Sequence, residues 1–177
     1  MKKLFVFFLF FCCIQMHAQI ELTNGGVKWL TIYNSSNFDE IVNSISDAIG
    51  SAPVKDKNES DEMFASTTSS KATWTISGTN GRKSVFEYKK VTTFNVANGE
   101  HSIAYFTSTF TYPAYEKSIA QSKFDDLYRG LVKEIGNPQL TFSPANLEWE
   151  TTKVKKKLQL KQENNEWKVV HSDRSKK

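Results

Sequence analysis

The segment 72–112, ATWTISGTNGRKSVFEYKKVTTFNVANGEHSIAYFTSTFTY, decides the fold. Apolar and polar residues alternate in it with a period of two, and the dipeptides Asn80-Gly81 and Asn98-Gly99 interrupt the alternation. An Asn-Gly pair between alternating segments is a strong local signal for a β-hairpin, because the tight turn needs residues that tolerate positive φ. We therefore expect three antiparallel strands over 72–77, 83–97 and 101–112.

Helical patterns flank this segment on both sides. Over 38–49, apolar residues recur at three- and four-residue spacing, with Ser36 or Asn37 as a cap and Gly50 behind them. After the segment, Pro113 opens a second pattern of helical period that stops at Gly136. Capping residues at the start and glycine at the end mark both as amphipathic helices.

The remaining segments add strands and one loop. A β-branched and aromatic run over 27–33 predicts a first strand, and 147–152, 156–162 and 166–171 predict three more around turns at 153–155 and 164–165. The polar segment 54–71 has no clear period, so we expect a mobile loop there. The predicted fold is α+β: two helices packed on one face of an antiparallel sheet, in the order β-α-βββ-α-βββ.

This order suggests two related halves, 36–112 and 114–172. At an offset of 86 residues, Ser36, Phe38, Asp39, Ile49 and Gly50 match Ser122, Phe124, Asp125, Ile135 and Gly136. A duplication explains these identities, and so does independent selection of capping serines, first-turn acids and a terminal glycine. Both explanations stay open.

The run IGNPQL followed by LEWETTKVKKKLQLKQENNEWKVV resembles small secreted or envelope α+β modules of Gram-negative bacteria. The two-fold helix-plus-sheet order is similar to the tandem modules of β-lactamase inhibitor proteins. One half is similar to the small lipoprotein of the outer-membrane barrel assembly machinery. The resemblance is one of topology, spans about residues 36–172 and implies the fold alone, so we transfer no function from it.

The first nineteen residues, MKKLFVFFLFFCCIQMHAQ, have the layout of a secretory signal peptide cleaved near Ala18 or Gln19. The alternative of a lipoprotein signal at Cys12 or Cys13 needs a small residue before the cysteine, which is absent. We expect a single secreted or periplasmic domain over 20–177, without a thiol and without a transmembrane segment. The two lysines of the signal leave with it, which lowers the net charge from +4 to +2.

The C-terminal end of the chain carries the strongest local charge. From residue 151 onward there are nine Lys or Arg against three acids. We predict a basic interaction surface on one side of the C-terminal strands, made of Lys153, Lys155, Lys157, Lys161 and Lys168. Attraction to an anionic envelope component or protein face is one interpretation. A lysine-rich solvated face that discourages aggregation is the other.

The central strands carry an aromatic face. Phe86 and Tyr88 share one side of their strand, and Phe106 and Phe110 share one side of the next. The stripe is typical of a core beneath helices, and the alternative is a partial lining for an apolar ligand.

Residues with catalytic or metal-binding potential are few. We interpret His101 and His171 as surface or strand-end histidines, and the pairs Asp39-Glu40 and Asp125-Asp126 as helix-stabilising acids. The acids over 56–62 lack the spacing of a calcium loop.

We therefore expect no cofactor and no nucleic-acid binding. The leading hypothesis is a non-catalytic secreted or periplasmic binding protein for an unknown protein or envelope component. The alternatives are an envelope-associated protein that contacts anionic membrane surfaces peripherally through the basic hairpin, and a carboxylate-based hydrolase.

Overall fold

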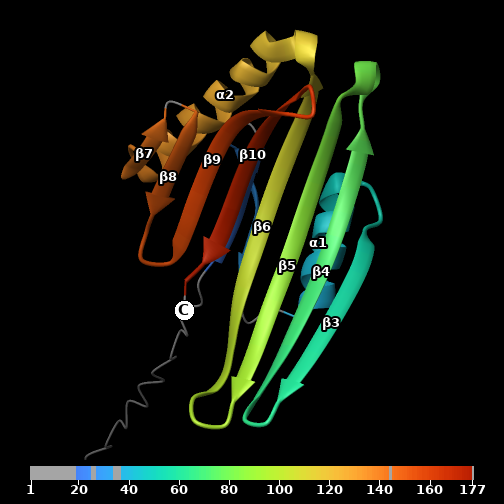
Figure 1. Ribbon diagram of the computed structural model, residues 1–177, viewed down its shortest axis with the longest axis vertical. Coiled ribbons are helices and arrows are strands. Elements are labelled where there is room, and N and C mark those ends of the chain that lie inside the picture. The colour runs from blue at the N-terminus through green and yellow to red at the C-terminus, as the bar shows by residue number, and fades with distance from the viewer. Residues whose placement is uncertain (1–18, 25–26, 34–36, 144, 177) are drawn as a thin grey trace, which may run out of the picture.

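The computed structural model describes residues 19–24, 27–33, 37–143 and 145–176. They form an eight-stranded antiparallel sheet with the strand order β3-β4-β5-β6-β10-β9-β8-β7, a two-stranded hairpin and two α-helices (Figure 1). The elements are β1 (Gln19–Asn24), β2 (Val27–Tyr33), α1 (Phe38–Ile49), β3 (Val54–Glu62), β4 (Ala65–Ser77), β5 (Lys83–Asn95), β6 (Gly99–Pro113), α2 (Lys117–Ile135), β7 (Leu140–Ser143), β8 (Asn146–Glu150), β9 (Val154–Glu163) and β10 (Glu166–Ser175). Short 3-10 turns, Thr79–Gly81 and Ala114–Glu116, precede β5 and α2.

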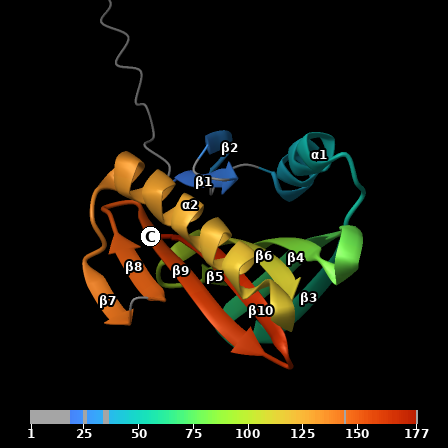
Figure 2. The same cartoon turned by 90° about the horizontal axis from the view of Figure 1, so that it is seen from above.

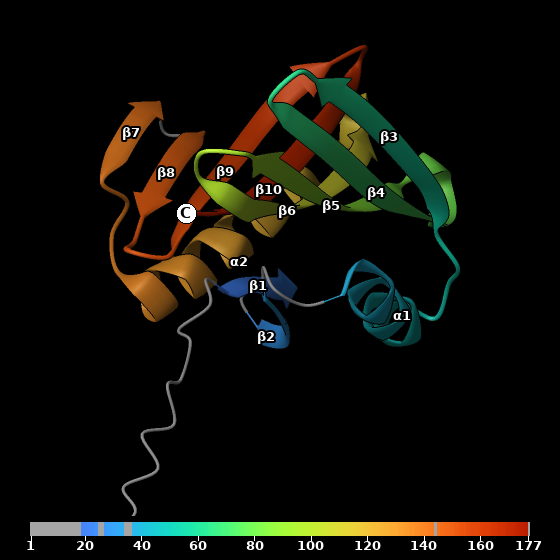
Figure 3. The ribbon, with the colours of Figure 1, turned by 90° about the horizontal axis from the view of Figure 1, so that it is seen from below.

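Both helices and the β1–β2 hairpin lie on one face of the sheet, which we call the inner face (Figures 2 and 3). Helix α1 contacts β4, and α2 packs across β6, β9 and β10. The opposite face, the outer face, carries no other element of the described chain (Figure 3). This arrangement confirms the predicted α+β class with an antiparallel sheet and two helices.

The strand count corrects the prediction in detail. The segment 54–71, predicted as a mobile loop, forms β3 and the first half of β4. All nine residues of β3 are exposed, since it is an edge strand, and its sequence therefore carries no apolar alternation. Strand β7 is also exposed along its length, and it has only four residues. Each helix is thus followed by four strands rather than three, and the predicted first strand, 27–33, is β2, which pairs with the unpredicted β1.

The predicted helix boundaries follow from their caps. The Asn37 side chain accepts a hydrogen bond from the Asp39 amide at 2.8 Å, and Gly50 ends α1 with a φ of 71°. Helix α2 begins at Lys117, later than Pro113, and ends before Gly136. Ser122 therefore lies inside α2 and cannot be a cap, while Ser36 and most of the predicted signal peptide (1–18) lie outside the described residues.

The core lies between the inner face and the two helices. Alternate residues of the strands point into it, as the period of two predicts. The buried members are Ile41, Val42, Ile45, Ala72, Trp74, Phe86, Tyr88, Ala104, Phe106, Phe110, Tyr112, Ala120, Phe124, Leu127, Leu131, Leu147, Trp149, Leu158, Leu160 and Val169.

The two halves repeat one arrangement of helix and four-stranded meander. The meanders β3–β6 and β7–β10 join through their last strands, because β6 pairs with β10. In each half a fully buried tryptophan on the second strand bonds the end of the preceding helix. Trp74 donates to Ser46 Oγ at 3.0 Å, and Trp149 donates to the Gly136 carbonyl at 2.9 Å. The shared arrangement is compatible with the proposed duplication.

We predict that Trp149→Phe lowers the free energy of unfolding by about 2 kcal/mol, because it removes the bond to Gly136 and leaves space beside Tyr128 in the core. Urea unfolding followed by circular dichroism measures the change. Trp167→Phe, at a partly buried ring, is the matched control and costs less than about 1 kcal/mol. Equal losses in both variants would contradict the role of the Trp149 bond.

Candidate functional site

The outer face of the sheet presents a row of cations that crosses the strands. Cross-strand pairing places Lys71 opposite Lys89, Lys89 opposite Tyr105, Tyr105 opposite Arg174, and Arg174 opposite Lys155. We call Lys71, Lys89, Arg174 and Lys155, with Tyr105 at the centre, the cationic row. Because paired residues share a face of the sheet, all five side chains belong to the outer face.

The row is regular and only partly neutralised. Neighbouring strands lie about 4.8 Å apart, so four strand intervals separate Lys71 from Lys155 by about 19 Å. Arg174 lies over the Tyr105 ring, with its guanidinium carbon 5.6 Å from the ring centroid. Lys71 Nζ is 3.7 Å from Glu87 Oε2, whereas Lys89 and Arg174 form no ion pair within the described ranges. Like charges placed opposite each other in a sheet repel, and an anion bound over the row would relieve that repulsion.

The basic surface predicted from the sequence is divided by the structure. Lys155 belongs to the cationic row, and Lys157 lies in the next row along β9. Lys161 and Lys168 face each other at the other end of β9 and β10. Both contact Glu163, with Nζ–carboxylate distances of 2.6 and 3.2 Å. The structure therefore brings together one of the predicted lysines with three cations that sequence reasoning missed.

Glutamates of β8 pair with the lysines of β9 on this face. Glu148 is almost buried between Lys155 and Lys157, whose Nζ atoms lie 3.0 and 3.3 Å from its carboxylate oxygens. The hydrogen bond from Lys155, with that from Lys157, holds the pKa of Glu148 below its usual range. Glu148 therefore neutralises Lys155, at one end of the cationic row, together with Lys157, and Lys89 and Arg174 are the members of the row without an ion pair among the described residues.

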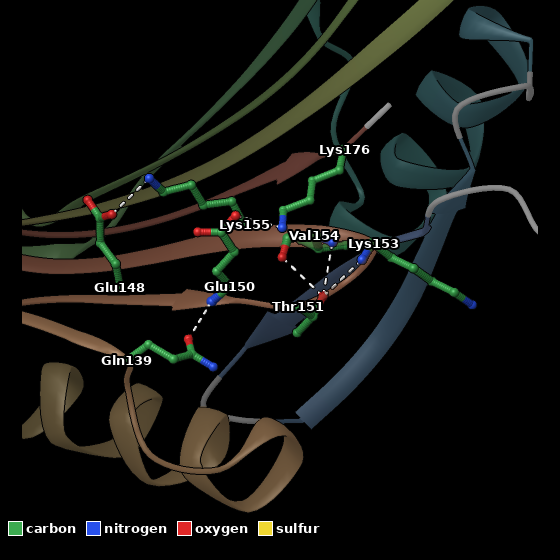
Figure 4. Close-up of polar contacts among 8 residues, drawn as sticks. All are labelled: Gln139, Glu148, Glu150, Thr151, Lys153, Val154, Lys155 and Lys176. Carbon is green, nitrogen blue, oxygen red and sulfur yellow. Dashed lines mark hydrogen bonds and ion pairs between the residues drawn. The ribbon is translucent and has the colours of Figure 1, made fainter.

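The β8–β9 turn and the end of β10 form one corner of the outer face (Figure 4). Thr151 orders the turn, since its hydroxyl accepts from the Val154 amide at 3.0 Å. Lys176 contacts Glu150 at 2.6 Å and lowers the pKa of that carboxyl. A cavity of about 230 Å³ lies at this corner, lined by Ile103, Glu150, Lys155, Arg174, Ser175 and Lys176.

Lys153 lies in the same turn and differs from its neighbours. Its amide donates to the Thr151 hydroxyl, while its side chain extends away from the other labelled residues (Figure 4). It forms no ion pair with the part of the chain that the structure describes. The corner therefore carries one cation, Lys153, whose side chain extends away from the other residues of the corner.

The aromatic face predicted from the central strands lies in the core. Phe86, Tyr88, Phe106 and Phe110 are between 0% and 7% exposed. Phe86 contacts Phe110 edge to face at 6.0 Å between ring centroids, and Tyr88 stacks on Phe38 of α1 at 5.5 Å. Tyr88 thus contacts α1, and Phe110 faces Lys123 of α2 at 4.3 Å, so the stripe lies beneath both helices.

His171 corrects the interpretation as a surface or strand-end histidine. It is 2% exposed on the inner face of β10, beside the equally buried Asp173. His171 Nε2 lies 3.0 Å from Asp173 Oδ1, and Lys156 Nζ lies 3.0 Å from Asp173 Oδ2. Burial alone would raise the pKa of the Asp173 carboxyl, but attraction to His171 and Lys156 outweighs it and lowers the pKa. Lys156 and Asp173 thus form an ion pair within the apolar layer, and with His171 beside it we call these residues the compensated cluster.

The acids singled out in the sequence have structural partners or lie apart. Asp39 pairs with Lys55 at 2.7 Å, Asp125 accepts from Gln121 at 2.9 Å, and Asp126 pairs with Arg129 at 2.5 Å. The acids of 56–62 are divided between the two faces of β3, with Asp56 and Glu62 on one and Glu59 and Asp61 on the other, because successive residues of a strand point in opposite directions. The described residues contain no group of three His, Cys, Asp or Glu placed to hold a metal ion.

Among the helices of the described ranges, none has the length and apolar character that a membrane span requires. No protein-family model, curated protein or solved structure matches this chain.

We predict that Asp173 makes stability depend on pH. Its folded-state pKa is depressed, so its contribution is present above the unfolded pKa of about 3.9 and is lost as the pH falls through the folded value. Asp173→Asn leaves Lys156 buried without its counter-ion and costs about 3–5 kcal/mol at neutral pH. Urea unfolding at pH 7 and at lower pH measures both effects.

The double variant Lys156→Met, Asp173→Asn is the control, since it removes both members of the pair and recovers part of the loss. Unchanged stability of Asp173→Asn at pH 7 would contradict the compensated cluster.

Proposed function

We propose that this protein is a non-catalytic binding protein that holds an anionic partner against the outer face of its sheet. The observation that carries the proposal is the cationic row, which crosses β4, β5, β6, β10 and β9 on a face that no described element covers. The partner class is an acidic protein surface or another anionic component with charges spaced along one direction.

The geometry favours an extended anionic group over a single small ion. A row of cations at strand intervals of about 4.8 Å offers repeated contacts, each weak alone in water but additive along the row. Tyr105 supplies a half-buried aromatic surface at the centre, a residue type that is enriched in protein interfaces. The glutamates of β8 limit the row at one end and would orient an acidic partner by repulsion.

The setting for this binding is proposed to be outside the cytoplasm. The N-terminal pattern of two lysines, an apolar run and a short polar segment supports export as a secreted or periplasmic protein.

Neutralising the row tests the proposal. We predict that Lys89→Gln with Arg174→Gln weakens binding of fluorescent polyglutamate about tenfold, measured by fluorescence anisotropy at low salt. Added salt should weaken binding of the unaltered protein, because it screens exposed charges.

The matched control is Lys161→Gln with Lys168→Gln, which makes the same change in net charge on the same face but outside the row. It should retain most of the affinity. Equal loss in both double variants would show a bulk charge effect and would contradict a site at the row.

A second candidate function is contact with an anionic membrane surface through the corner of the outer face. Lys153 lies beside Lys176, whose amide donates to the Lys153 carbonyl at 2.8 Å, and its side chain extends away from the other labelled residues (Figure 4), which favours this candidate. We predict that Lys153→Gln reduces sedimentation with phosphatidylglycerol vesicles, while polyglutamate binding to the cationic row is unchanged. Vesicle binding that depends neither on the salt concentration nor on Lys153 would rule out this candidate.

A further inference from the structure

Two hairpin tips present an apolar cluster at one end of the sheet. Met63 and Phe64 form the β3–β4 turn, while Phe94 and Val96 lie at the β5–β6 turn. Their exposed fractions are 89%, 68%, 48% and 71%, so each keeps about half or more of its surface in water. We call these four residues the apolar tip. Figure 1 shows the two hairpins ending side by side, beyond the region that the helices cover.

The apolar tip is held together by backbone pairing. The Val96 amide donates to the Phe64 carbonyl at 3.2 Å, and the β4–β5 ladder continues to the pair Ala65–Asn95. The two turns therefore form one fixed convex end rather than two independent loops.

The strands behind the tip are polar on the inner face. Ser66, Thr68 and Ser70 occupy the inner-face positions of β4 there, and Thr92 bonds Ser102 at 2.8 Å between β5 and β6. These positions are only partly buried, in contrast to Ala72 and Trp74 further along β4. A polar inner face and apolar side chains at the end suit insertion tip first, with the strands remaining in a hydrated layer.

Acidic residues select the surface that the tip can enter. Asp61 and Glu62 precede the first turn, and Glu100 follows the second. Three carboxylates behind the apolar side chains repel anionic lipid, whereas the ammonium groups of zwitterionic headgroups complement them. A convex apolar end also suits a fluid surface, which deforms around it, better than a rigid protein cavity that must match its shape.

We propose that the apolar tip inserts into the headgroup region of a zwitterionic lipid bilayer. Insertion buries the four exposed side chains and leaves the carboxylates at the level of the headgroups. This contact is independent of the cationic row, because it uses other residues and a lipid without net charge. It predicts weak, reversible attachment, since the buried apolar surface is small.

Flotation with phosphatidylcholine–phosphatidylethanolamine vesicles tests the proposal on the full chain without its predicted signal peptide. We expect the unaltered protein to float with the vesicles, and Phe64→Ser to bind about tenfold more weakly through loss of one inserted aromatic side chain. Replacing part of the lipid by phosphatidylglycerol should weaken binding.

Phe142→Ser is the matched control, because Phe142 is an equally exposed phenylalanine (64%) at the other edge of the sheet. It should bind as the unaltered protein does, and circular dichroism should show both variants folded. Failure of the unaltered protein to float, equal loss in Phe64→Ser and Phe142→Ser, or binding confined to phosphatidylglycerol vesicles would each overturn the proposal. Binding confined to phosphatidylglycerol vesicles would assign membrane contact to the corner formed by the β8–β9 turn and the end of β10 instead.

Discussion

The antiparallel pairing of β6 with β10 joins the two halves of the protein, and both faces of the sheet depend on it. It places Phe106 beside Asp173 on the inner face and Tyr105 beside Arg174 on the outer face. A slip of one residue would exchange the faces of the whole second meander, because side chains alternate along a strand. The buried Asp173 would then reach water, and Arg174 would enter the core. Register at this one pairing therefore decides both the core and the cationic row.

Because the helices cover only one face of the sheet, the two faces have different roles. The helices and the tryptophans Trp74 and Trp149 complete the inner layer, which encloses the ion pair of Lys156 and Asp173. The outer face carries threonines, lysines and Tyr105, which remain partly exposed. The sheet edges are protected in other ways: β3 is charged along its length, and β7 has only four residues. The face, rather than an edge, is thus the surface offered to a partner.

Sequence patterns predicted the central hairpins, both helices, the C-terminal strands and the alternation of Leu158 and Leu160 with the lysines of β9. The turns at Asn80-Gly81 and Asn98-Gly99 also fix the register of their two hairpins, which sets Lys71 opposite Lys89 and Lys89 opposite Tyr105. Strands β3 and β7 were not predicted, because a strand without a buried face shows no apolar alternation. The burial of His171 was not predicted, because a histidine near a chain end gives no local sign of burial.

The sequence by itself determined the local elements and which side chains share a side of each strand, since the period of two is a property of neighbouring residues. The tertiary structure alone decided that the two meanders join through β6 and β10. That pairing brought Arg174 and Lys155 into line with Lys71 and Lys89, and the folded sheet placed Lys156 and His171 against Asp173 and set two apolar turns side by side. These contacts join residues far apart in the chain, and they arise from the burial of one continuous sheet face beneath two helices rather than from any local pattern.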